Sequence, residues 1–484
     1  MAARGSSFAG GIAMTMARWS TWSAPVLGLT LGLLASQATA ETLGDALIAA
    51  YWTYPGLQAR REDQRAVDEG VSQARSGYQP TLGVTAGVLG SETALPLLGQ
   101  INASGVGLVG EQPLYTGGRV AHAITAAQAD VAAGREGLRT ADQALLLNVI
   151  AAYVDVRLDL ERLAISQESA EVLSHRFDEA QANLRVKVIT RTDLAQTEGR
   201  LAAARTRVAA AEAQLGISQD HYRALVGHAP VDLAPEPPIA AALPHTLDDA
   251  LRVAAERDPR IRQAEATARA SAARVAEAKA RSRPEVSVRA ALGVAGGGPA
   301  GASPFSNYDR FGAAALVFRL PLSSGGLIAS GVRQATARAG AADLEVEETR
   351  REAERALSQA WRQVTAARAS VAGNAEQVRA ASAAWEGVRR EADVGLRTPL
   401  DVLNAEQALR EAQFGLVSAR RDEYVASATL LAAMGALDLD VLAPGAQMYD
   451  PRARAATDPS RQGVAPWTTL IEAFDRMGDG RSSR

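Results

Sequence analysis

The chain has 484 residues, of which 47% are hydrophobic and 22% charged, a composition typical of a folded protein. The formal net charge is −3 and no dense basic stretch occurs, which argues against nucleic acid as a partner. There is no cysteine, which excludes disulfides, thiolate metal sites, a catalytic cysteine and an N-terminal lipid anchor on cysteine. Aromatic residues make up only 5% while alanine is abundant, which favours closely packed helices over a bulky globular core.

Residues 1–40 have the pattern of a cleavable secretory signal peptide. Arg4 and Arg18 supply positive charge, residues 24–35 are apolar, and Ala38-Thr-Ala40 is an A-x-A cleavage site, so Glu41 is expected to begin the mature chain. The apolar run is shorter than the roughly 20 residues that a membrane helix needs. Because no later stretch is apolar enough to span, a mature chain that crosses a membrane is expected to do so with strands.

Residues 41–240 and 241–443 are predicted to be two copies of one unit. The matching landmarks, in chain order, are Thr42-Leu-Gly-Asp-Ala-Leu47 with Thr246-Leu-Asp-Asp-Ala-Leu251, Pro55 with Pro259, Pro80 with Pro284, Pro113-Leu-Tyr-Thr-Gly-Gly118 with Pro321-Leu-Ser-Ser-Gly-Gly326, and Gly227 with Gly435. Residues 444–484 are predicted to be a mostly flexible tail with one short amphipathic piece near Trp467 to Met477.

Each copy is expected to begin with a helix and continue with a β-hairpin. The helices are expected over residues 42–77 and 246–282, with Thr42 and Thr246 as N-caps. Alternating runs on either side of Gly- or Pro-rich loops then predict strands, at residues 82–88 with 106–108 and at 286–294 with 311–320. Aromatic residues beside these runs are expected at a membrane interface: Tyr78, Tyr115, Phe305, Tyr308 and Phe311. Judged alone, the strands also fit surface hairpins of a soluble domain.

Long helices are predicted over residues 119–186 and 327–393, each entered through a pair of glycines that allow a tight turn. At about 1.5 Å per residue each reaches on the order of 100 Å. Their apolar spacing is close to 3.5, as in coiled coils, and the first seam is Leu145, Val149, Tyr153, Val156, Leu160 and Leu163. Shorter helices over residues 193–226 and 401–434 are expected to return and to end at Gly227 and Gly435.

Each long helix is separated from the shorter one by a short turn, which we predict to be the tip of a helical hairpin. The tips are Val186-Lys-Val-Ile-Thr-Arg-Thr-Asp-Leu194 and Val394-Gly-Leu-Arg-Thr-Pro-Leu-Asp-Val402. Thr190 with Asp193, and Thr398 with Asp401, predict capping boxes, which would account for the aspartates without any further role. Alternatively, if several chains direct their tips at one axis, Asp401 forms a ring of like charges that attracts cations and is held closed by Arg397 or Arg191.

No catalytic motif accompanies these features. The histidines are scattered, and no G-x-S-x-G, H-E-x-x-H or dinucleotide fingerprint occurs in the required context, so no enzyme, cofactor or metal site is expected. One chain offers four strands, whereas bacterial membrane barrels begin at eight. Several chains are therefore expected to pool their strands.

The sequence resembles the TolC-like outer-membrane efflux, or outer membrane factor, family over residues 42–442. The resemblance is carried by Gln112-Pro-Leu-Tyr-Thr-Gly-Gly118, by Leu320-Pro-Leu-Ser-Ser-Gly-Gly326, and above all by Val394-Gly-Leu-Arg-Thr-Pro-Leu-Asp-Val-Leu-Asn404, which is similar to the family's V-G-x-R-T-x-x-D-V-L-D segment. It implies an α+β membrane protein, a homotrimer whose 12-stranded outer-membrane β-barrel (four strands per chain) continues into a long periplasmic α-helical coiled-coil barrel.

The resemblance also implies roles for the tip residues. Asp401 falls on the first entrance aspartate, Arg397 on the arginine of the network that keeps the entrance shut, and Thr192 and Asp193 on its first-repeat partners. Three positions depart from the family: Asn404 replaces a second entrance aspartate, Ala392 a tyrosine, and Lys187 the tip glycine. The residues expected to dock an adaptor are Val394, Gly395, Leu396, Thr398, Val186, Lys187 and Val188.

The expected function is the exit duct of a tripartite export system, for type I protein secretion or small-molecule efflux. The implied partners are a periplasmic adaptor (membrane fusion) protein, an inner-membrane transporter of the ABC or RND type, and outer-membrane lipid. The expected location is the outer membrane of a Gram-negative cell, extending into the periplasm. The missing lipid-anchor cysteine favours the secretion branch. The alternative is a soluble periplasmic coiled-coil adaptor or scaffold with the strands as surface decoration.

Overall fold

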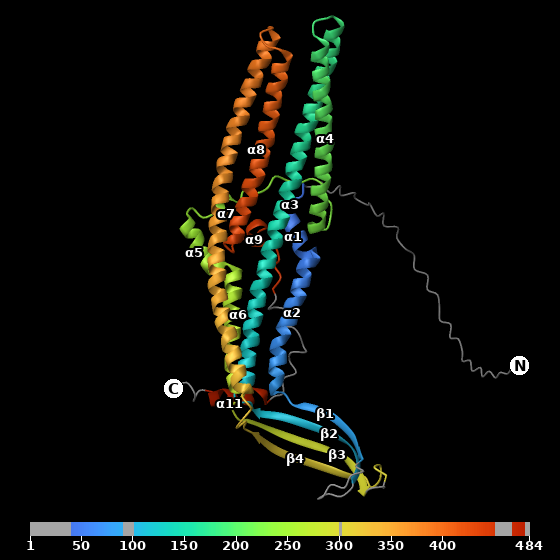
Figure 1. The fold of residues 1–484 in the computed structure, drawn as a ribbon, viewed down its shortest axis with the longest axis vertical. Coiled ribbons are helices and arrows are strands. Elements are labelled where there is room, and N and C mark those ends of the chain that lie inside the picture. Colours follow the sequence, from blue (N-terminus) through green and yellow to red (C-terminus); the bar gives the residue numbers. More distant parts are fainter. Residues whose placement is uncertain (1–39, 91–100, 300–302, 451–466, 480–484) are drawn as a thin grey trace, which may run out of the picture. The chain divides into compact units, whose positions relative to one another are not determined.

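A computed structural model describes residues 40–90, 101–299, 303–450 and 467–479. Apart from residue 40, the predicted signal segment lies outside these ranges. The helices are α1 (Leu43–Thr53), α2 (Pro55–Arg75), η1 (Ser76–Tyr78), α3 (Arg119–Arg185), α4 (Arg191–Val226), η2 (Ala240–Ala242), α5 (Leu247–Arg257), α6 (Pro259–Ala280), α7 (Leu327–Asp393), α8 (Pro399–Ala433), α9 (Leu439–Leu442) and α11 (Thr468–Asp479). The strands are β1 (Thr81–Gly90), β2 (Ile101–Tyr115), β3 (Glu285–Pro299) and β4 (Asp309–Arg319). The chain is thus mostly helical with one four-stranded sheet, which lies at the end of the helices opposite the two hairpin tips (Figure 1).

The sheet is antiparallel in the order β1-β2-β3-β4 and has two different faces. Val84 pairs with Leu108, and Leu108 with Leu292, so apolar side chains share one face, on which Val84 is 73% exposed. The opposite face carries Glu111 and Arg289, which pair at 3.0 Å. The predicted hairpins are confirmed, but β3 runs through residues 296–299, which were predicted to belong to a loop.

The prediction of one continuous opening helix in each copy is wrong. Tyr54 separates α1 from α2 and Asp258 separates α5 from α6, and both have extended backbone (ψ 117° and 116°). Each precedes a proline, Pro55 or Pro259, whose ring disfavours helical geometry in the residue before it. The proline then begins the next helix at its first position, where a missing N–H costs nothing. Thr42 and Thr246 are the N-caps, as predicted.

The long helices α3 and α7 contain 67 residues each, and their predicted bounds are confirmed to within one residue. Each follows a glycine pair in left-handed conformation, which ends at Gly118 (φ 83°) or Gly326 (φ 85°). The predicted seam of α3 is buried at its start but fails at Leu160, which is 43% exposed. A straight helix drifts by about 20° per heptad from a 3.5-residue repeat, so one stripe cannot stay buried along the whole helix.

The hydrophobic core lies along the middle of the helical region, where the two halves of the chain meet. Its largest fully buried members are Leu43, Leu47, Ile150, Tyr153, Tyr222, Leu357, Leu430, Leu431 and Leu437. The Tyr153 hydroxyl lies within hydrogen-bond distance of the backbone oxygens of Glu41 (2.9 Å) and Ala234 (2.6 Å), which ties the start of the described chain to the segment between α4 and α5. Among the described residues, no helix is both long and apolar enough to cross a membrane.

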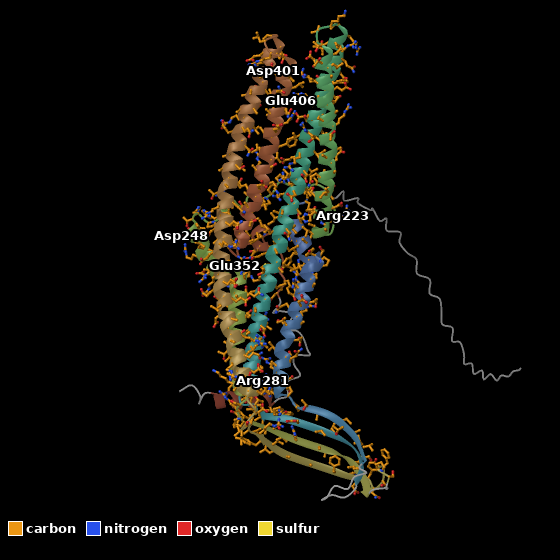
Figure 2. The ribbon with its side chains drawn as sticks, in the orientation of Figure 1. Arg223, Asp248, Arg281, Glu352, Asp401 and Glu406 are labelled. Atoms are coloured by element: carbon orange, nitrogen blue, oxygen red, sulfur yellow. The ribbon has the colours of Figure 1, made fainter. Side chains whose placement is uncertain are left out.

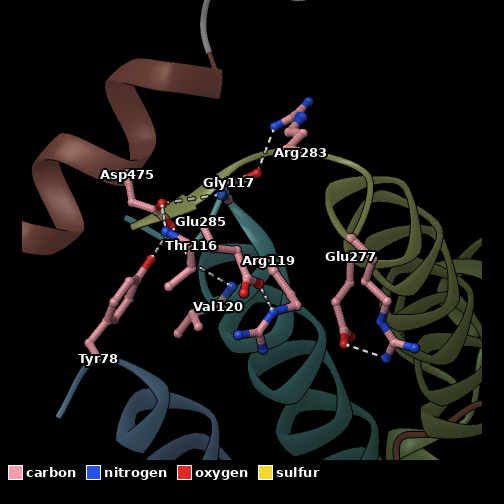
Figure 3. Close-up of polar contacts among 11 residues, drawn as sticks. Tyr78, Thr116, Gly117, Arg119, Val120, Glu277, Arg283, Glu285 and Asp475 are labelled. Atoms are coloured by element: carbon pink, nitrogen blue, oxygen red, sulfur yellow. Dashed lines mark hydrogen bonds and ion pairs between the residues drawn. The ribbon is translucent and has the colours of Figure 1, made fainter. Parts of the chain in front are cut away.

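The tail contributes an ordered helix to the body. α11 packs beside η1, β2 and α3, and its Ile471 joins a small core with Tyr78, Val120 and Ile124. The prediction of Tyr78 at a membrane interface is wrong, because Tyr78 is fully buried and its hydroxyl donates to Asp475 at 2.8 Å (Figure 3). The amphipathic piece predicted near Trp467 is this helix, and it packs against the body.

Candidate functional site

The two hairpin tips have the same backbone turn. The amide of Val188 donates to the Asn183 carbonyl (2.9 Å), and the amide of Leu396 donates to the Glu391 carbonyl (2.8 Å). The residue before each amide has left-handed geometry, with φ 60° at Lys187 and φ 78° at Gly395. This six-to-one bond with a left-handed residue is a Schellman turn, which satisfies the last carbonyls of the long helix.

The capping boxes predicted at both tips are confirmed. The Asp193 amide donates to the Thr190 hydroxyl (3.2 Å) and the Thr190 amide donates to the Asp193 carboxylate (2.9 Å). Asp401 and Thr398 repeat this arrangement at 3.2 and 3.0 Å. Hydrogen bonds from the threonine backbone and hydroxyl lower the pKa of Asp193, and those from the threonine hydroxyl and backbone lower the pKa of Asp401. In both boxes the bonds end on one carboxylate oxygen, Oδ2, so capping occupies only half of each carboxylate.

Arg397 forms an ion pair within its own hairpin. Its Nε lies 2.7 Å from Glu391 Oε2, and this hydrogen bond raises the pKa of Arg397. Glu391 was not among the residues predicted for this tip. A Schellman turn at this tip would have indicated Glu391 as the partner of Arg397, because its six-to-one bond brings the last turn of the long helix beside the residues that follow the tip. When the two capping boxes are aligned, Ile189 and Asn183 stand where Arg397 and Glu391 stand, so the first tip has no equivalent pair.

A groove of about 270 Å³ separates the two hairpins at their tips. All four hairpin helices line it, and its charged members are Arg176, Glu179, Asp193, Arg389, Asp393 and Arg397. The fold therefore brings Asp193 of the first copy and Arg397 of the second to one groove. Thr192 and Asp401 are not among the residues that line it.

Below the groove, arginine side chains join the first hairpin to α8, and we call this set of contacts the arginine seam. Arg410 binds both carboxylate oxygens of Glu168 (2.9 and 3.1 Å), and Arg421 binds Asp155 (2.6 Å). Arg200 donates to the side-chain oxygen of Asn404 at 2.6 Å, an unpredicted partner for this position. Figure 2 shows Asp401 and Glu406 along α8. Glu406 lies in the arginine seam, and burial raises the pKa of its carboxyl group.

Apolar side chains project from both tips. Val186, Val188, Val394 and Leu396 are between 68% and 76% exposed, and Lys187 and Gly395 lie between them. These four side chains place exposed apolar surface at the far end of both hairpins.

Comparison with known proteins gives a consistent result. The family model for outer membrane efflux proteins matches residues 53–228 and 250–436. Outer membrane efflux protein BepC of Brucella suis is 32% identical over 87% of this chain and 91% of its own length. Outer membrane protein TolC of Escherichia coli is 23% identical over 92% of this chain and 91% of its own.

A solved structure shows the same fold. The CmeC outer membrane channel of Campylobacter jejuni superimposes with a TM-score of 0.71 at 15% sequence identity, over 86% of this chain and 90% of that one. Because the family model covers most of the residues and BepC aligns over nearly the whole length, the chain belongs to the outer membrane efflux protein family and is an outer-membrane protein.

Proposed function

We propose that this protein is the exit duct of a tripartite export system. Three copies pool their strands into a twelve-stranded barrel in the outer membrane, and their helices continue as a hollow tube in the periplasm. The observation that carries the proposal is the sheet, in which β1 and β4 are edges and one face is apolar and exposed. Edge strands readily pair with another chain, and four strands are too few to close around a channel.

The duplication supports the same arrangement. The two segments matched by the family model, residues 53–228 and 250–436, fall within the proposed copies 41–240 and 241–443. Each copy supplies one β-hairpin and one helical hairpin, and the two tips share a turn. Three chains would therefore present six similar hairpins around one axis. Residues 444–484 stand outside the repeat.

We propose that the tips form the periplasmic gate. In the closed state the arginine seam between α3, α4 and α8 holds the second hairpin against the first. Arg397, which Glu391 of its own hairpin holds in place, and Asp193 of the first hairpin line the groove between them, and Thr192 is the further partner that we propose for Arg397. Asp401 supplies the carboxylate of the entrance ring. Asn404 adds no charge there and is bonded to Arg200, so each chain contributes one carboxylate from this pair of positions.

The apolar tips are the proposed docking surface for a periplasmic adaptor protein, which connects the duct to an inner-membrane transporter of the ABC or RND type. Val186, Lys187, Val188, Val394, Gly395, Leu396 and Thr398 make up this surface. The cargo is a protein in type I secretion or a small molecule in efflux.

The test is the behaviour of the purified protein in a membrane. Native mass spectrometry of the detergent-extracted protein should give three times the mass of the mature chain, and planar lipid bilayers should show discrete cation-conducting channels. Recovery as a soluble periplasmic monomer without channel activity would contradict the proposal and favour a coiled-coil adaptor or scaffold.

A further inference from the structure

Helix α11 has three distinct faces. Thr468, Ile471 and Asp475 face the body and are 1%, 8% and 0% exposed. Trp467, Leu470 and Phe474 form a second stripe, at 48%, 72% and 63% exposed. Their spacing of three and four residues places them on one side of the helix. Thr469, Glu472 and Arg476 occupy the third, polar face.

The buried carboxylate of Asp475 fixes this helix in place. It accepts hydrogen bonds from the Tyr78 hydroxyl (2.8 Å), the Thr116 amide (2.8 Å) and hydroxyl (2.9 Å), and the Gly118 amide (3.2 Å) (Figure 3). Burial and the hydrogen bond to Asp475 raise the pKa of Tyr78. A buried carboxylate is tolerated only with such donors, so this set of bonds specifies where α11 sits. The position is the junction at which β2 ends and α3 begins.

The side chain of Trp467 shows on which side of the sheet α11 begins. Its indole Nε1 donates to Gln112 Oε1 at 3.1 Å, and Gln112 Nε2 donates to the Tyr78 carbonyl at 2.9 Å. Gln112 is an even number of residues from Leu108 and Val106 along β2, so all three side chains are on the apolar face of the sheet. The exposed apolar stripe of α11 therefore begins where the exposed apolar face of the sheet ends.

We propose that α11 is an interfacial helix whose stripe of Trp467, Leu470 and Phe474 inserts among lipids at the periplasmic edge of the outer membrane. The inference rests on the proposed insertion of the sheet in that membrane. A helix with one apolar face, one polar face and a tryptophan at the boundary is typical of segments that lie in the membrane interface. The surface it continues is the one that the proposed duct presents to lipid, which favours lipid over a second copy of the chain. Because Asp475 ties the helix to the strand-to-helix junction, α11 sets the depth at which the sheet enters the membrane.

The absence of cysteine makes the test direct, since every introduced thiol is unique. Phe474→Cys, Thr469→Cys on the polar face and Val84→Cys on the sheet face are each spin-labelled in the full-length protein. The proteins are placed in vesicles of phosphatidylethanolamine and phosphatidylglycerol. Collision rates with oxygen, which concentrates in lipid, and with a neutral nickel chelate, which stays in water, are then compared.

We expect labels at positions 474 and 84 to favour oxygen and the label at 469 to favour the chelate. Adding Asp475→Ala should abolish the oxygen preference at 474 while leaving it at 84, which also shows that the sheet is still folded and inserted. A label at 474 that favours the chelate, while 84 favours oxygen, overturns the interfacial helix and leaves the proposed function intact. A label at 474 that is shielded from both reagents overturns the interfacial helix and indicates that a second copy of the chain covers the stripe. A label at 84 that favours the chelate overturns the proposed function as well.

Discussion

The two hairpin tips share one backbone and differ in the side chains that it carries. Both end their long helix in a Schellman turn and begin the next helix with a Thr–Asp capping box. Only the second has glycine at the left-handed position and an ion pair across the turn, between Arg397 and Glu391. The first has Lys187 at that position and Ile189 in place of the arginine. The turn is thus a local structural requirement met twice, whereas the ion pair that we propose as part of the gate occurs at the second tip and not at the equivalent positions of the first.

Replacement of Arg397 should give the largest difference between the tips. Arg397→Ser removes the pair with Glu391 and its charge from the groove, so the resting conductance of single channels should rise several-fold. Ile189→Ser is the matched control at the equivalent position of the first tip, and it should leave the conductance near that of the unmodified protein. Equal effects of the two substitutions would contradict a latch confined to the second tip.

A second pair of variants separates the cap from the charge at Asp401. Thr398→Ala and Asp401→Ala both break the capping box, but only Asp401→Ala removes a carboxylate from the tip. If Asp401 lines a charged ring, Asp401→Ala should weaken the block of the channel current by Mg²⁺ several-fold, and Thr398→Ala should change it little. If Mg²⁺ blocks the current of both variants as strongly as that of the unmodified protein, Asp401 acts only as a helix cap.

The left-handed positions should respond to substitution in opposite directions. Gly395→Ala forces a Cβ into positive φ and should lower the free energy of local opening at the second tip by about 1 kcal/mol. Lys187→Gly relieves the same strain, so the free energy of local opening at the first tip should rise by about 0.5–1 kcal/mol. Hydrogen exchange of the amides in the last turns of α3 and α7 measures both. Destabilisation by Lys187→Gly would show that the lysine side chain has a stabilising contact of its own.

The smallest expected effect is a shared response to acid. The pKa values of Asp193 and Asp401 are lowered in the folded protein, so their capping contribution is present above the ordinary carboxyl pKa of about 4 and is lost as the pH falls through the lowered value. Amides at the start of α4 and α8 should keep constant protection between pH 6 and 8 and lose it below about pH 4. Thr190→Ala and Thr398→Ala should flatten this dependence. A loss already at neutral pH would mean that another group controls the tips.

The features that could be predicted from the sequence are those whose cause is local. The capping boxes, the glycine turns before α3 and α7, and the alternating strands each depend on residues within a few positions of one another. The breaks at Tyr54 and Asp258 are also local, and the prolines that cause them were visible, but a periodic pattern on both sides concealed them. By contrast, the Tyr78–Asp475 bond joins residues 397 positions apart, and no local pattern marks either of them as a partner. The pairs of Arg410 with Glu168 and Arg200 with Asn404 likewise depend on how two hairpins align in space.

The central claim, that the pair of Arg397 and Glu391 fixes the second tip in the conformation that closes an export channel, is tested most directly by exchanging the two charges. Single-channel conductance in planar lipid bilayers is measured for Arg397→Glu, for Glu391→Arg, and for the double variant that carries both. We expect each single variant, which places like charges side by side, to raise the resting conductance, and the double variant to return it to the unmodified level. A double variant as open as the single ones would contradict the claim.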